Sequence, residues 1–443
     1  MRLNKRQIAV ITVLNVVIAA LVAAIFLLPA VASANGGGGG NGGNTDVITP
    51  PTDEHEKLRE PTAGRVPQIQ RETRLMGTGD ETVEAVHFVD GIAFIFGNAT
   101  VSGLDFDSYG GFLCMVGSKG NILGFTYFDG RLTAVGVAEG GFAAATIVRG
   151  GTDEAVARLY SVDYDGKAEA VATLDGAASD IIAIGGTRVA VVTKPNVNSF
   201  KLTEYAVTGD GWAAEHNTRI TSGYTLDYFD CYRLGDGYIL AARAYSLPRY
   251  DSIVFYTFEA GGDATAHFYG GSGDSIMQPY AVMPYPEGYV ALCRRNGVAA
   301  IVTVDYTFMS YRRDLLGFAF DGARLLYCND LYYACFDSAD GSTVYELNEK
   351  LNRRTLSAAD GMSPSCAVKS AGAIIVGATD DGKAKLTDAS GSRALSLDIQ
   401  SGVFYGGYRT TDGNTVIVLS ATGGDALTAP SGGRDVYVIC VKI

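Results

Sequence analysis

Residues 159–171 read LYSVDYDGKAEAV, two short runs suited to β-strands on either side of the acidic turn Asp163-Tyr164-Asp165-Gly166. An EF-hand calcium loop with Gly166 at its sixth position requires a bidentate carboxylate at its twelfth, and Ala172 occupies that position. An Asp-Gly pair instead supplies the positive φ angles of a tight turn between antiparallel strands. The segment therefore predicts a strand, a turn and a second strand, and no metal site.

This unit recurs along the chain. A glycine opens an apolar run, a polar break follows, and a partner strand ends in another turn. The opening strands read GGFLCMVGS, GGFAAATIV, GTRVAVVTK, DGYILAARA, EGYVALCRR, DLYYACFDS, GAIIVGATD and GNTVIVLSA. Their partners read ILGFTYFDG, VARLYSVDYDG, KLTEYAVTGDG, SIVFYTFEAGG, AIVTVDYTFMS, STVYELNEK, AKLTDASGS and VYVICVKI. Units of roughly 35 to 50 residues are too small to bury their own faces, and they predict an all-β radial repeat.

In this repeat, residues 81–443 resemble β-propeller proteins in general, whose blades have about four strands each. The Trp-Asp pairs of WD40 blades are absent, and SADGSTV at Ser338–Val344 lacks a spacer and the tryptophan of a sialidase Asp-box, so no subfamily is indicated. An array of β-sandwiches, the alternative, would need linkers between units of about 100 residues. No Pro/Ser-rich break follows residue 80.

The repeat predicts eight blades, or seven if residues 82–140 form a single irregular blade. The last strand, VYVICVKI, has no outer strand after it. We expect one of the two strand-like segments within residues 82–97 to pair with it and so close the ring, because closure removes exposed sheet edges.

The N-terminus carries a membrane or export signal. Arg2, Lys5 and Arg6 precede an apolar run over Ile8–Leu28, long enough for the ~20 residues of a membrane-spanning helix. Ala32-Ser33-Ala34 fits a signal-peptidase site. Residues 1–34 are thus predicted to be one apolar helix, either a signal-anchor or a cleaved signal peptide. In both cases the following domain lies outside the cell membrane, and cleavage after Ala34 would release it.

Residues 35–80 are rich in Gly, Asn, Pro and charged side chains and show no periodicity. Such a stretch cannot bury a core and predicts a disordered linker between the apolar helix and a propeller over residues 81–443. A flexible spacer next to an apolar segment favours a retained anchor.

The composition of the chain bears on which partners it can bind and which chemical sites it can contain. The net charge of −13 disfavours nucleic acid. The seven cysteines have irregular spacing, most lie in apolar runs, and none forms a C-x-x-C pair, so we expect buried thiols and neither disulfides nor a metal site. No linear catalytic motif occurs, and no catalytic residue or cofactor is assigned.

Tyrosine is the most unusual local feature. The segment 222–252 and the segment MQPYAVMPYPEGY at 277–289 are dense in tyrosine. The tyrosines in alternating strand positions are expected in the core. Those beside proline or in polar breaks, with one arginine, are predicted to lie on loops and to bind a ligand: Tyr245, Arg249, Tyr250, Tyr280 and Tyr285. Loop aromatics suit sugar rings or extended peptides because they lose little entropy on binding.

Two arginine pairs, Arg294-Arg295 and Arg312-Arg313, are read as solvated strand ends, with a carboxylate-binding funnel as the alternative. Together these features predict a membrane-tethered, extracytoplasmic propeller that binds an envelope glycan, peptide or protein at a bacterial cell surface. The alternative is an enzyme with its site in the axial funnel, such as a glycoside hydrolase, a lyase or a quinoprotein-like oxidoreductase.

Overall fold

The computed structural model describes residues 68–75, 80–100, 109–149, 155–208, 211–273, 276–328, 330–339, 341–348, 353–356, 362–369, 373–379, 383–388, 394–400, 402–411, 413–423, 427 and 433–442. The chain divides into two units, Met1–Lys57 and Leu58–Ile443, and all described residues belong to the second. The predicted apolar helix over Ile8–Leu28 lies outside them. Within the described part, no helix has the length and apolar character needed to span a membrane.

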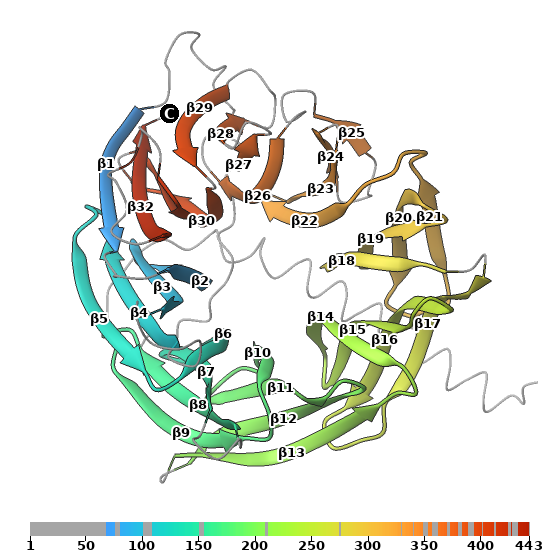
Figure 1. The fold of residues 1–443 in the computed structure, drawn as a ribbon. Coiled ribbons are helices and arrows are strands. Elements are labelled where there is room, and N and C mark those ends of the chain that lie inside the picture. The colour runs from blue at the N-terminus through green and yellow to red at the C-terminus, as the bar shows by residue number, and fades with distance from the viewer. Residues whose placement is uncertain are drawn as a thin grey trace, which may run out of the picture. The chain divides into compact units, whose positions relative to one another are not determined.

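The described residues form eight four-stranded antiparallel sheets (Figure 1). In seven of these sheets, the strands follow one another in chain order. The first four of the seven comprise β2 (Glu81–Val89), β3 (Ile92–Thr100), β4 (Tyr109–Gly117), β5 (Ile122–Phe128); β6 (Arg131–Ala138), β7 (Gly141–Arg149), β8 (Ala155–Asp163), β9 (Ala168–Leu174); β10 (Ala178–Ala183), β11 (Arg188–Asn196), β12 (Ser199–Thr208), β13 (Gly211–Thr221); and β14 (Thr225–Leu234), β15 (Gly237–Ser246), β16 (Tyr250–Glu259), β17 (Thr265–Ser272).

The other three comprise β18 (Gln278–Tyr285), β19 (Gly288–Arg295), β20 (Val298–Asp305), β21 (Tyr311–Leu315); β22 (Gly322–Cys328), β23 (Leu331–Ser338), β24 (Gly341–Leu347), β25 (Arg353–Thr355); and β26 (Met362–Lys369), β27 (Ala373–Thr379), β28 (Lys383–Asp388), β29 (Ala394–Gln400). The last sheet joins both ends of the chain, in the order β30 (Val403–Arg409), β31 (Thr415–Ala421), β32 (Asp435–Lys442) and β1 (Gln68–Leu75).

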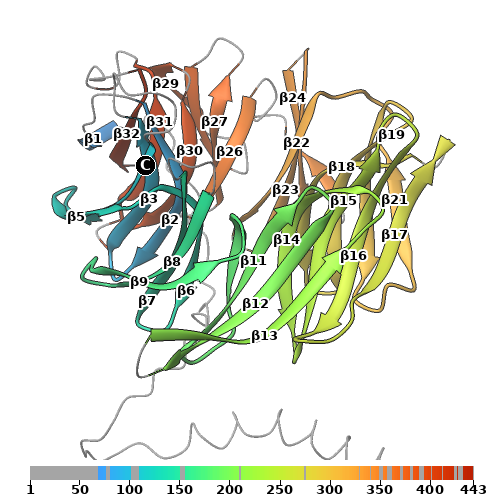
Figure 2. The same cartoon turned by 60° about the horizontal axis from the view of Figure 1, so that its bottom comes forward.

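The first strand of each sheet contacts the first strand of the next, and β30 contacts β2, so the sheets form a closed ring (Figures 1 and 2). The prediction of an all-β β-propeller is therefore confirmed. The segment LYSVDYDGKAEAV, residues 159–171, spans the β8–β9 turn, at the outer edge of its sheet. Gly166 has a φ of 81°, and an oxygen of Asp163 accepts hydrogen bonds from the amides of Asp165 and Lys167, as in a turn.

Three details of the predicted layout were wrong. The ring is closed by β1, which pairs with β32, and the two segments within residues 82–97 form β2 and β3 of the following sheet. Because β1 begins at Gln68, the β-domain starts well before residue 81 and includes part of the stretch assigned to a linker. Finally, the opening strands of the repeat are second strands of their sheets, except GGFLCMVGS, which contains part of the third strand β4.

The inner strands of each sheet have continuous apolar runs because neighbouring sheets cover both of their faces. In β11, Val189 and Val191 pack into the core shared with the preceding sheet, while Ala190 and Val192 pack into the core shared with the following one. Successive side chains of a strand point to opposite faces, so a strand buried on both sides loses the apolar–polar alternation of a half-exposed strand. The fourth strands are more polar, as the exposed middle of β13 illustrates.

Polar side chains also join neighbouring sheets. Asn98 of β3 is buried; its side-chain oxygen accepts a hydrogen bond from the amide of Leu132 in β6 (2.8 Å), and its Nδ2 donates to the carbonyl of the same residue (3.1 Å) and to Glu84 (2.8 Å). Arg294 of β19 similarly donates to the carbonyl of Phe320, just before β22. These contacts hold one sheet against the next near the axis.

Replacement of Asn98 by alanine is expected to destabilise the domain by about 2–4 kcal/mol, because both backbone groups of Leu132 would lose a buried partner. Chemical denaturation followed by tryptophan and tyrosine fluorescence measures the change. Lys119→Ala, at an exposed turn, is the control. A loss below about 0.5 kcal/mol would show that the contact between the sheets does not depend on Asn98.

Candidate functional site

The predicted site residues lie on two different faces of the ring. We call the ends of the sheets at which the first strands begin the N face, and the opposite ends the C face. Tyr245, Arg249, Tyr250 and Tyr280 lie toward the N face, at the β15–β16 turn and near the start of β18. Tyr285 ends β18 and so lies on the C face. The five residues do not form one site.

The rings on the N face make contacts within the protein. The Arg243 guanidinium lies 4.5 Å from the centre of the Tyr245 ring. Tyr250 stacks on Tyr224, with 4.1 Å between ring centres. Tyr280 packs against Phe320 at 4.8 Å, and the guanidinium of Arg294 lies 5.1 Å from its ring. Arg249 is exposed in the turn.

The arginine pairs are separated as well. Arg294 reaches toward the next sheet, whereas Arg312 and Arg313 lie on the fourth strand β21, where Arg312 pairs with Asp314 at 2.9 Å. They do not form a common funnel.

On the C face, tyrosines from three neighbouring sheets gather around Tyr306, which follows β20. We name this group the tyrosine patch: Tyr232 (β14), Tyr285 (β18), Tyr306, Tyr327 (β22) and Tyr332 (β23). Tyr232 and Tyr306 are stacked with 6.2 Å between ring centres, and Tyr327 and Tyr332 lie 4.9 Å apart. The Tyr306 hydroxyl donates to the carbonyl of Tyr285 (2.9 Å). Burial, followed by the neighbouring phenols Tyr232, Tyr332 and Tyr285, raises the pKa of Tyr306 to about 12.

The loop between β20 and β21 places Tyr306 and Phe308. One oxygen of Asp305 accepts hydrogen bonds from the Thr307 hydroxyl (2.7 Å) and from the amides of Thr307 and Met309. Phe308 has a φ of 58°, a left-handed conformation uncommon for a bulky residue. Its ring stacks on His267 of β17 at 4.6 Å. The loop of one sheet therefore covers the C-face end of its neighbour.

A pocket of about 370 Å³ lies beneath this loop, between the sheets β14–β17 and β18–β21. Its walls are mostly apolar or aromatic, with Leu234, Ile239, Phe258, Tyr306 and Phe308 among them. His267 and Thr257 supply polar groups, with 3.2 Å between Nε2 and Oγ1. Concave sites of this size and lining, with few polar groups, are typical of small-ligand sites.

Two aspartates, Asp180 and Asp230, lie on the first strands β10 and β14 of their sheets. A bulge in β14 separates Tyr228 from Asp230. Tyr228 turns back to β10 and donates a hydrogen bond to Asp180. Asp230 has one buried oxygen without a hydrogen-bond partner, and burial, then the charge of Asp180, raises its pKa to about 6. The charge of Asp230 also raises the pKa of Tyr289, after burial, so this phenol lies near Asp230.

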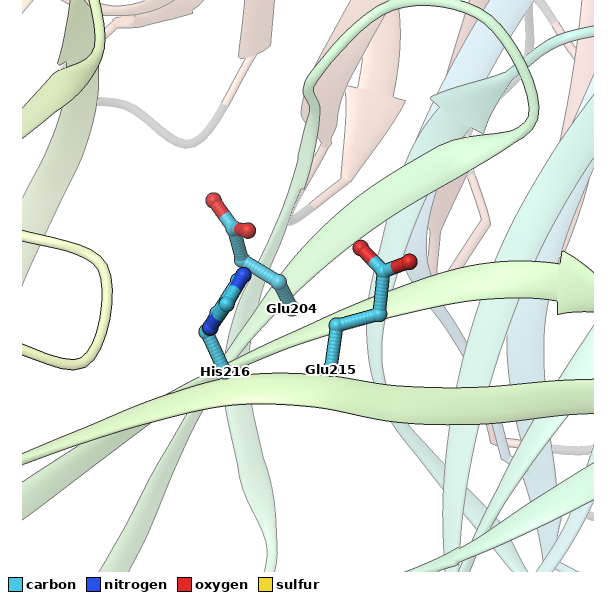
Figure 3. A group of neighbouring side chains, drawn as sticks. All are labelled: Glu204, Glu215 and His216. Carbon is cyan, nitrogen blue, oxygen red and sulfur yellow. The ribbon is translucent and has the colours of Figure 1, made fainter.

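One group among the described residues has the composition of a metal site: Glu204 of β12 with Glu215 and His216 of β13 (Figure 3). Both glutamates already have a cation, because Arg188 pairs with Glu204 at 2.9 Å and with Glu215 at 2.7 Å. Glu204 also accepts a hydrogen bond from the Tyr238 hydroxyl (2.6 Å). The group is thus an internal ion-pair network, and a metal would have to displace Arg188.

Five residues of this region were not predicted from the sequence: Tyr232, Tyr306, Tyr327, Tyr332 and Asp230. Each lies in or directly after a strand, where the pattern predicts a core position for a tyrosine, and the three sheets that carry these residues come together only when the ring forms. Residues 300–310, AIVTVDYTFMS, read as one continuous partner strand, and no polar break marks the loop that begins at Tyr306.

Comparison with known proteins adds the fold alone. No protein-family description matches the sequence, and no curated protein matches it. Among solved structures, the Dos1 propeller aligns with a TM-score of 0.50 at 10% identity, over 84% of this chain and 95% of that one. The β-propeller domain of the Trilobed protease from Pyrococcus furiosus has a TM-score of 0.43 at 7% identity, covering 72% of this chain and 97% of that one. An acylaminoacyl peptidase has 0.46 at 9%, covering 77% and 58%. At these identities the likeness is one of fold, and the chain is a β-propeller.

Proposed function

We propose that this protein is a binding module that recognises an envelope glycan, peptide or protein through the tyrosine patch on its C face. The observation that carries the proposal is the convergence of five tyrosines from three sheets beside a pocket of about 370 Å³. Tyr232 and Tyr327 are 39% and 51% exposed, so their rings are available to a ligand.

Tyrosine suits this role because its ring is rigid and offers both an apolar face and a hydroxyl. The Tyr306 hydroxyl is held by Tyr285, and its ring is stacked on Tyr232, so a ligand would meet a preformed surface. Preorganisation lowers the entropy lost on binding. A loop that holds Phe308 in a left-handed conformation adds to this rigidity.

We further propose that each four-stranded sheet of the described residues is one blade, giving eight, and that Ile8–Leu28 anchors the chain as a single-pass segment with the propeller outside the cell membrane. Mass spectrometry of the N-terminus of protein recovered from cells tests the anchor. A mature chain beginning after Ala34 would replace tethering with secretion.

Tyr306→Ala is expected to weaken binding at least about 10-fold, because the loss of a central aromatic anchor commonly costs ~2 kcal/mol or more of binding free energy. The assay is co-sedimentation of the purified domain, residues 58–443, with isolated cell-wall glycan, together with binding to an immobilised peptide array. Tyr127→Ala is the matched control, since Tyr127 is a tyrosine 77% exposed on the fourth strand β5. Equal binding by wild type and both variants would refute a site at the patch.

An axial-funnel enzyme is the second candidate, and Asp180 with Asp230 favours it. Two neighbouring carboxyls with raised pKa are typical of acid–base catalysis. The two candidates differ in what happens to a bound glycan. A binding module returns it intact, whereas a hydrolase or lyase shortens it in a reaction that Asp180→Asn abolishes. Chromatography of the recovered glycan separates the two outcomes.

A further inference from the structure

Several charged groups near the tyrosine patch are carboxylates, and one neighbouring cation, Arg233 of β14, donates its guanidinium hydrogen bond to the carbonyl of Ile184. After burial, the charges of Glu287 and Asp305 raise the pKa of Tyr285. Tyr327 donates a hydrogen bond to Asp330 (2.9 Å), and burial together with this contact raises its pKa to about 12. Both Glu287 and Asp330 are exposed in the turns that lead from the first strand of a sheet to the second. Asp236 is exposed in the equivalent turn of the sheet β14–β17.

A carboxylate also lies beneath the patch. Asp230 is two residues before Tyr232 in β14, so both side chains lie on the same side of the strand. One oxygen of Asp230 is buried without a hydrogen-bond partner. Beside it, Tyr289 is 1% exposed, and its hydroxyl likewise has no partner among the described residues. The charges of Asp230, Tyr306 and Tyr232 all act on this hydroxyl, which places it at the base of the patch.

Buried polar atoms are normally paired, and the negative charge of an unpaired carboxylate below a set of aromatic rings favours a cation in front of those rings. Aromatic faces attract cations through their quadrupole, and the attraction strengthens where water is excluded. The net charge of −13 for the whole chain adds a long-range attraction for positive ligands. A positively charged ligand is therefore favoured by all three features: the aromatic rings, the buried carboxylate and the exposed carboxylates of the turns.

We infer that the tyrosine patch takes lysine or arginine side chains from a basic, extended peptide segment of a partner protein. This inference rests on the proposed binding function and names the chemistry of its ligand. The cationic group lies against Tyr232 and Tyr306, above the buried charge of Asp230, while Asp236, Glu287 and Asp330 attract further positive residues of the same segment.

The test measures fluorescence anisotropy with the domain of residues 58–443 and two labelled Gly/Ser peptides. One carries four interspersed lysines, and the other carries four glutamates at the same positions. We expect the lysine peptide to bind and the glutamate peptide to bind at least 10-fold more weakly. The dissociation constant of the lysine peptide should rise at least fivefold between 50 and 300 mM NaCl, because surface charge attraction is screened by salt.

Asp230→Asn should weaken binding of the lysine peptide at least 10-fold, and Tyr306→Ala should do the same. Asp129→Asn is the control, since it makes the same change in net charge in the turn between β5 and β6, on the N face. Circular dichroism checks that each variant is folded. If Asp230→Asn alone fails to fold, Asp330→Asn replaces it, with an expected weakening of at least threefold.

Two results would overturn the inference. If a neutral cell-wall glycan binds in a Tyr306-dependent way while the lysine peptide does not, the binding function stands and its cationic ligand is wrong. If the lysine peptide binds equally to wild type, Asp230→Asn and Asp129→Asn, the attraction is nonspecific. If no probe depends on Tyr306, the proposed function itself fails.

Discussion

A chain that begins at residue 80 is expected to be much less stable than one that begins at residue 68. The shorter chain lacks β1, and β32 becomes an exposed sheet edge. Leu75, which is buried in the core, and Arg74, which lies 3.6 Å from the buried Asp435, are lost with it. Burial of one leucine is worth about 2 kcal/mol, and the loss of a partner for a buried charge adds to this.

We expect the free energy of unfolding to fall by at least about 3 kcal/mol and the melting temperature to fall by about 4 °C or more. Differential scanning calorimetry of chains that begin at residues 58, 68 and 80 measures it. The chains that begin at 58 and 68 both keep β1 and should melt together. Equal melting of all three would mean that the pairing of β1 with β32 contributes no stability.

Glu81→Gln is expected to remove the loss of stability that Glu81 causes as the pH rises from 5 to 8. Glu81 begins β2, is only 4% exposed, and its carboxyl group lies next to the carboxyl group of Asp435, with which it shares a side-chain hydrogen bond. Burial, followed by the charge of Asp435 and then that of Asp80, raises its pKa from 4.5 to about 8. Arg74, at 3.6 Å from Asp435, is the cation of this group.

The direction of the effect follows from proton linkage. The folded state holds the proton of Glu81 up to about pH 8, whereas the unfolded state releases it near pH 4.5. The contribution of Glu81 to stability is therefore greatest below pH 4.5. It falls by about 1.4 kcal/mol for each pH unit between 4.5 and 8, and it is lost as the pH rises through 8. The total is of order 3–5 kcal/mol, and glutamine, which cannot ionise, avoids this loss.

Urea unfolding at pH 5, 6, 7 and 8 compares wild type with Glu81→Gln. The variant should be the more stable protein at pH 8, and the two curves should converge toward pH 5. Glu169→Gln, at an exposed position of β9, controls for the loss of one carboxylate. Parallel curves for wild type and Glu81→Gln would show that Glu81 is ionised in the folded protein at neutral pH.

These two predictions concern the junction of the ring, which sequence reasoning placed incorrectly. The strand β1 reads QIQRETRL, with its polar side chains and only two large apolar residues, Ile69 and Leu75. Such a pattern does not predict a β-strand, and its polar composition resembles that of the residues before it. It becomes a strand because β32 offers a free edge, whose unpaired amides and carbonyls accept any chain that can reach them.

The candidate site illustrates the same limit. The tyrosine-rich residues between 222 and 289 lie in the sheets β14–β17 and β18–β21, which both contribute to the tyrosine patch, and Tyr285 belongs to it. Tyr245, Tyr250 and Tyr280 share that density, yet they lie toward the opposite face. Whether a tyrosine lies at the N or C face depends on the strand direction and on the bulge in β14, neither of which local composition encodes.

The sequence by itself determined the repeated unit of strand, turn and strand, and with it the β-propeller, because apolar runs and Asp-Gly turns act within a few residues. In LYSVDYDGKAEAV, the turn geometry is complete without the rest of the chain. Only the tertiary structure decided how the ring closes, which tyrosines meet, and why Glu81 and Asp230 have raised pKa values. Those properties arise from burial between sheets and from charges distant in the chain, which come together only when the ring forms.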